Sequence, residues 1–112
     1  MTAPAYDEKR WSAMPLAEQM ANIGSEVGRT RKWLSKGKIA MAEGAFVRAL
    51  DLIDLTVKYG RLGKPSRGAL LEELCRAREI FCGAYLEADF DNLAYLDKYF
   101  GDFALAWQTA SK

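Results

Sequence analysis

Residues 16–34 read LAEQMANIGSEVGRTRKWL, and their apolar side chains return at the spacing of an α-helix. The spacing is 4-3-4-3-4 along one stripe, which is made of Leu16, Met20, Ile23, Val27, Thr30 and Leu34. Because such a repeat places these side chains on one face, we predict an amphipathic helix over about residues 15–36. Pro15 is tolerated in the first turn of a helix, and Gly37 is a typical residue for its end.

Three further segments show the same helical period. They are residues 39–59, residues 66–87, and a segment that follows the turn at 89–92 and continues to about residue 109. The stretch RLGKP at 61–65 marks a turn, and Ser66 after it is a good N-terminal cap. No stretch alternates apolar and polar residues, so no strand is predicted. Four helices with short connections predict an all-α, up-down-up-down four-helix bundle in a single domain.

The chain ahead of these helices is polar, apart from Trp11. We expect residues 1–13 to be a flexible leader, with Trp11 in contact with the bundle, and residues 14–112 to form the bundle. Half of the 112 residues are hydrophobic, so one core is feasible without disulfides or metal. Neither a secretion signal nor a stretch of 18 apolar residues is visible, so we expect a cytoplasmic protein without a membrane anchor.

The two cysteines, Cys75 and Cys82, lie seven residues apart in a segment of helical period. On a helix they share one side but stand about 10.5 Å apart along the axis, which is too far for a disulfide between them. Their stripe also contains Leu71 and Arg78. We interpret it as core and expect buried, unreactive thiols that suit a reducing compartment.

The composition excludes several kinds of catalytic site. Histidine is absent, which rules out serine–histidine and cysteine–histidine pairs and the glutamate–histidine motif of di-iron bundles. A magnesium site of carboxylates alone would draw on the acidic residues of the segment 66–87 and the turn after it, namely Glu72, Glu73, Glu79, Glu87, Asp89 and Asp91. Their spacing lacks the paired acidic motif of helical phosphohydrolases, so a solvated helix face is favoured. We therefore expect no catalytic residues, no metal and no cofactor.

A dense basic cluster surrounds an aromatic residue at the end of the first predicted helix. Its members are Arg29, Arg31, Lys32, Trp33, Lys36 and Lys38. Basic side chains with an interleaved aromatic can hold RNA phosphates and stack on a base. Cations at a helix C-terminus also complement the helix dipole, and the whole chain has a net charge of only +1. The sequence therefore favours a solvated helix end, with a nucleotide- or RNA-binding site as the alternative.

A second stripe on the same helix consists of small residues, namely Ala17, Ala21, Gly24 and Gly28. A glycine inside a helix costs about 1 kcal/mol relative to alanine, so the close approach of another backbone is the simplest explanation. We predict that this stripe packs against a helix of the same bundle or of a partner. The balanced charge permits self-association, so we expect a homodimer or a contact with another small protein.

The layout of four helices over roughly residues 15–108 resembles the small HEPN proteins and the related nucleotidyltransferase-partner bundles. The stretch LAEQMANIGSEV at 16–27 is also similar to small prokaryotic helical proteins of this length. RNase members of the HEPN family carry an Arg-x(4–6)-His motif, and without a histidine this activity does not follow. The resemblance implies a nucleotide- or RNA-binding partner bundle. It is the alternative to the leading expectation, a non-enzymatic bundle that acts through protein contacts.

Overall fold

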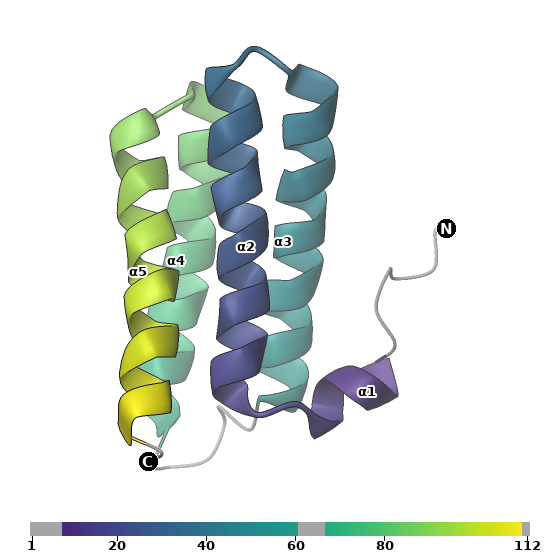
Figure 1. The fold of residues 1–112 in the computed structure, drawn as a ribbon, viewed down its shortest axis with the longest axis vertical. Coiled ribbons are helices and arrows are strands. Elements are labelled where there is room, and N and C mark those ends of the chain that lie inside the picture. Colours follow the sequence, from purple (N-terminus) through teal and green to yellow (C-terminus); the bar gives the residue numbers. More distant parts are fainter. Residues whose placement is uncertain (1–7, 61–66, 111–112) are drawn as a thin grey trace.

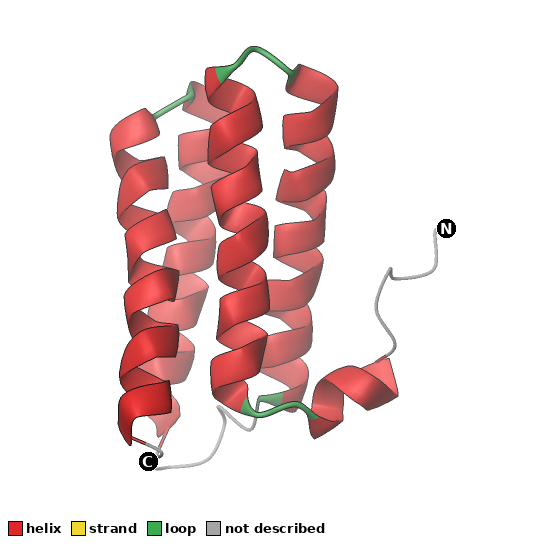
Figure 2. Ribbon diagram, in the orientation of Figure 1, coloured by secondary structure: helices red, strands yellow, loops and turns green. Residues whose placement is uncertain are grey.

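The computed structural model describes residues 8–60 and 67–110, and no strand occurs in them (Figure 2). Four long helices lie side by side (Figure 1), and they are α2 Leu16–Ser35, α3 Ile39–Tyr59, α4 Gly68–Glu87 and α5 Phe90–Ala110. α2 packs against α3 and α5, and α4 closes the ring by packing against the same two helices. Successive helices are therefore neighbours, and the predicted all-α fold of four long helices is confirmed.

A short helix, α1 Glu8–Ala13, precedes the bundle and packs on α3. Its Trp11 is fully buried in the core. Gln19 of α2 anchors this helix, because its Nε2 donates to the carbonyl oxygens of Trp11 at 3.0 Å and Met14 at 3.1 Å. The sequence pattern did not predict a helix here. The first part of the expected leader, residues 1–7, lies outside the described residues.

Glycine ends α2 at the position that the sequence predicted. Gly37 has a φ of 71°, and the N–H of Lys38 donates to the carbonyl of Trp33 at 2.9 Å, as in a Schellman motif. α4 ends in the same way, but its left-handed residue is Ala88, with a φ of 52°. The predicted turn at 61–65 and the Ser66 cap lie outside the described residues.

The core lies between the four long helices and uses most of the predicted apolar stripes. Its fully buried apolar side chains include those of Met20, Ile23, Leu52, Ile53, Leu74, Phe81, Leu93, Leu96 and Phe100. The apolar stripe of α2 is buried from Leu16 to Thr30, and Leu34 at its end is half-buried. Along the described chain, no helix combines the length and hydropathy that crossing a bilayer requires.

The predicted burial of the cysteine stripe is wrong. Cys75 is exposed and Cys82 is half-buried, and both thiols are free. The buried residues of α4 are Leu74, Ala77, Phe81 and Ala84. The cysteines lie beside this face, near Arg78, whose side chain pairs with the exposed Asp54 of α3. A helical period reveals an apolar face, but the positions of the neighbouring helices decide which edge of that face is covered.

Candidate interaction surfaces

The small-residue stripe of α2 faces α5. A Cβ added at Gly24 would lie 3.0 Å from the Cβ of Phe100, and one added at Gly28 would lie 3.2 Å from Oδ1 of Asp97. Ala17 is buried, whereas Ala21 is exposed. The helix that approaches both glycines is therefore a helix of the same chain.

Beside this contact, α2 and α5 leave a shallow surface groove of about 320 Å³. Its lining residues are Ala21, Gly24, Ser25, Gly28, Asp97, Phe100 and Gly101. Gly101 lies in the interior of α5, and no described atom comes within 4 Å of a Cβ added there. Unlike Gly24, it has no close neighbour in the described chain that would exclude a side chain.

The structure divides the basic cluster between two sides of α2. Arg31 turns towards α5, where its Nη1 donates to Oδ2 of Asp97 at 3.0 Å. Lys32 and Lys36 instead flank Trp33, which is half-buried, and their Nζ atoms lie 4.9 Å and 5.7 Å from the centroid of its ring. The predicted cluster is therefore not one surface, because Arg31 belongs to the rim of the α2–α5 groove.

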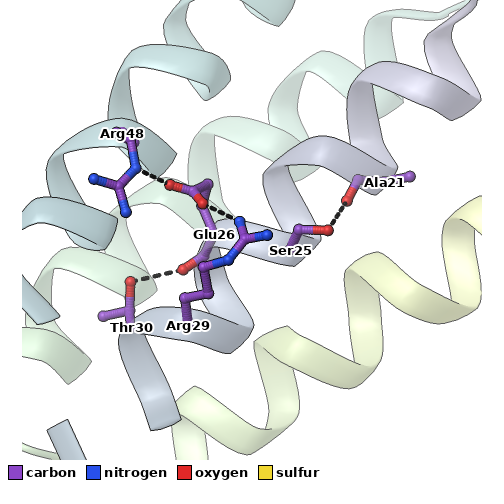
Figure 3. A network of polar contacts seen from close by, with 6 residues as sticks. All are labelled: Ala21, Ser25, Glu26, Arg29, Thr30 and Arg48. Atoms are coloured by element: carbon purple, nitrogen blue, oxygen red, sulfur yellow. Dashed lines mark hydrogen bonds and ion pairs between the residues drawn. The ribbon is translucent and has the colours of Figure 1, made fainter. Parts of the chain in front are cut away.

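Glu26 connects Arg29, the other arginine of the basic cluster, to Arg48 of α3 (Figure 3). Its side chain is only 3% exposed. One carboxylate oxygen accepts a hydrogen bond from Nη1 of Arg29, and the other accepts one from Nε of Arg48. Thr30 Oγ1 donates to the main-chain carbonyl of Glu26 at 2.8 Å. One buried carboxylate thus holds guanidinium groups that come from two different helices.

Neither Glu26 nor Arg48 was among the candidate site residues predicted from the sequence. The signal that could have revealed Glu26 is its position, because it continues the spacing of Ile23 and Thr30 on the buried side of α2. A charged residue in an apolar stripe requires a partner. The partner on α3 could not be identified in the same way, because its choice depends on the register between two helices.

Carboxylates near the α4–α5 turn do not form a metal site in the part of the chain that the structure describes. Within it, no group of three or more histidine, cysteine, aspartate or glutamate side chains is placed to hold a metal ion. Asp89 instead caps α5, since its Oδ1 accepts a hydrogen bond from the backbone N–H of Asn92 at 3.1 Å.

Comparison with known protein families, curated proteins and solved structures found no match to this chain. The chain is therefore described by its fold, as a small all-helical protein with four main helices.

Proposed function

We propose that the protein is a non-enzymatic helical bundle that acts through protein contacts and self-associates through the groove between α2 and α5. The supporting observation is that Gly101 lines this groove together with Gly24 and Gly28. A glycine inside a helix costs about 1 kcal/mol relative to alanine. At Gly101 neither a positive φ nor a close neighbour within the described chain requires a glycine. A helix of a partner lying in the groove would supply the missing neighbour, because a glycine lets two backbones approach closely.

The charges around the groove suit a second copy of the chain as that partner. A cation and an anion meet at its rim in the ion pair Arg31–Asp97. A rim that carries both signs equally can pair with a copy of itself across a two-fold axis. α2 and α5 have 20 and 21 residues, so each offers a contact about 30 Å long.

The test is the molar mass in solution, measured by light scattering for Gly101→Leu and for the matched variant Gly83→Leu. Gly83 also lies inside a helix with no described atom within 4 Å of an added Cβ, but on α4, away from the groove. The wild type and Gly83→Leu should be dimers, with twice the mass of the 12.5 kDa chain. Gly101→Leu should be a monomer, with the mass of a single chain. A wild type that remains monomeric up to its solubility limit would contradict the proposal.

A further inference from the structure

We infer that the α3 side of α2 carries a second binding site, which takes single-stranded nucleic acid. This basic face consists of Arg29, Lys32, Trp33 and Lys36 of α2 and Arg48 of α3. It does not include the lining of the α2–α5 groove, so the inference is independent of the proposed self-association.

The first reason is that the two arginines are held in place by a buried charge. Taking the Glu26 carboxylate out of water costs about as much free energy as its ion pairs return, and an apolar residue of similar size often serves stability equally well. Stability alone therefore does not explain Glu26. Its effect on the structure is to fix the guanidinium groups of Arg29 and Arg48 at one point between two helices.

The second reason is that both guanidinium groups remain accessible. The side chains of Arg29 and Arg48 are 54% and 42% exposed, and each donates one hydrogen bond to Glu26. Their other N–H groups are left to solvent or to a ligand. Gly44 leaves room for one of them, because a Cβ there would lie 3.2 Å from Nη1 of Arg48. The planar guanidinium matches the oxygens of a phosphate in a bidentate geometry.

The third reason is the aromatic ring one turn further along α2. Trp33 is half-buried, and Lys32 and Lys36 hold their ammonium groups within 6 Å of its ring centroid. An unpaired base can stack on such a ring while neighbouring cations contact the backbone phosphates. Bases in a duplex are not available for stacking, so the ring favours a single strand over a double helix.

The charge of the basic face is not cancelled by the acids closest to it. Of its four cations, Arg29 and Arg48 share one carboxylate, that of Glu26, and the ammonium groups of Lys32 and Lys36 lie over the Trp33 ring. Glu43 lies on the other side of α3, where its charge contributes to the raised pKa of Tyr85 on α4. Asp51 is exposed three residues beyond Arg48 and bounds the face at that end. This face is therefore basic, although the whole chain has a net charge of only +1.

Fluorescence anisotropy with a labelled single-stranded oligoribonucleotide and the full chain tests this site. The logarithm of the association constant should fall linearly with the logarithm of the salt concentration. The double variant Lys32→Gln/Lys36→Gln and the single variant Trp33→Leu should each weaken binding about tenfold. The control Lys58→Gln/Lys98→Gln removes the same charge from lysines that pair with Glu8 and Asp102 elsewhere, and it should retain the wild-type affinity. None of these changes touches Glu26, and circular dichroism confirms folding.

Two competing ligands separate nucleic acid from a simple polyanion. A duplex of the same sequence should bind at least about tenfold more weakly than the single strand, because its bases cannot reach Trp33. Inorganic polyphosphate should bind wild type and Trp33→Leu equally. The inference is overturned if the single strand does not bind at low salt, if the two lysine double variants are equally affected, or if Trp33→Leu binds the single strand as wild type does.

Discussion

Gly24 of α2 lies directly against Phe100 of α5, so that a Cβ added at Gly24 would be 3.0 Å from the Cβ of Phe100. We therefore expect Gly24→Ala to lower the free energy of unfolding by about 1–3 kcal/mol, because the added methyl group overpacks this contact. This cost exceeds the gain of up to about 1 kcal/mol that alanine brings through its helix propensity. Urea denaturation followed by circular dichroism measures the difference.

The matched control is Gly83→Ala on α4, where no described atom lies within 4 Å of the added Cβ. This variant should be more stable than the wild type by up to about 1 kcal/mol. Gly28→Ala should fall between the two, since its neighbour at 3.2 Å is the tip of the Asp97 side chain, which can move aside. If Gly24→Ala gained as much stability as Gly83→Ala, α2 and α5 would be further apart than described.

The ends of α2 and α4 provide a reciprocal pair of substitutions. Gly37 and Ala88 both adopt a left-handed backbone, with φ of 71° and 52°. This conformation suits glycine and costs other residues about 1 kcal/mol. Ala88→Gly should therefore raise the free energy of unfolding by up to about 1 kcal/mol, and Gly37→Ala should lower it by a similar amount. Thermal melting of both variants checks the signs, and a destabilised Ala88→Gly would contradict this account.

The two thiols should react at different rates in the native protein. Cys75 is exposed and Cys82 is half-buried, so a thiol reagent should label Cys75 quickly and Cys82 slowly. Absorbance during reaction with such a reagent should show two phases, and Cys75→Ser should remove the faster one. Two slow phases in the native state would instead mean that both thiols are buried, as the sequence predicted.

The four long helices could be predicted because each one repeats its apolar period over several turns. α1 could not, because six residues are too few to show a period, and this helix depends on the burial of Trp11 and on the hydrogen bonds from Gln19. A short segment of this kind is defined by its tertiary contacts and carries little signal of its own.

The basic cluster shows which parts of a site a sequence pattern can predict and which it cannot. Arg29 and Arg31 are close in sequence but about 200° apart around a helix, so they face different neighbours. The helical period alone could have separated them. The same period gives no information on Arg48, because the contact between Glu26 and Arg48 depends on how α2 and α3 are aligned along their lengths.

Tyr99 should make the protein less stable at alkaline pH. Burial raises the pKa of its hydroxyl above the ordinary value of 10.0, and the charge of Glu73 on α4 raises it further. Above about pH 10 the unfolded chain loses this proton while the folded chain keeps it, so unfolding is favoured. The stabilising contribution is therefore complete below that pH and is lost as the pH rises towards the folded pKa.

Urea denaturation of wild type and Tyr99→Phe across about pH 9–11 tests this dependence. The free energy of unfolding of the wild type should fall more steeply, by up to about 1 kcal/mol per pH unit, because phenylalanine has no proton to lose. Parallel pH profiles for the two proteins would show that Tyr99 does not carry the effect.

The pair of Arg48 and Glu26 should matter more for stability than other ion pairs between helices. Arg48→Met keeps an apolar side chain of similar length but leaves the buried carboxylate with Arg29 alone, so we expect a loss of about 1–3 kcal/mol. Arg78→Met is the matched control, because Arg78 of α4 also bonds an acid of α3, at 3.0 Å, but that acid is Asp54, which is 58% exposed. An exposed pair contributes at most about 1 kcal/mol.

Combining Arg48→Met with Glu26→Gln should cost less than the sum of the two single losses, because each substitution removes the same interaction. Urea denaturation of these variants gives the coupling energy, and strictly additive losses would mean that Glu26 does not hold Arg48 in solution.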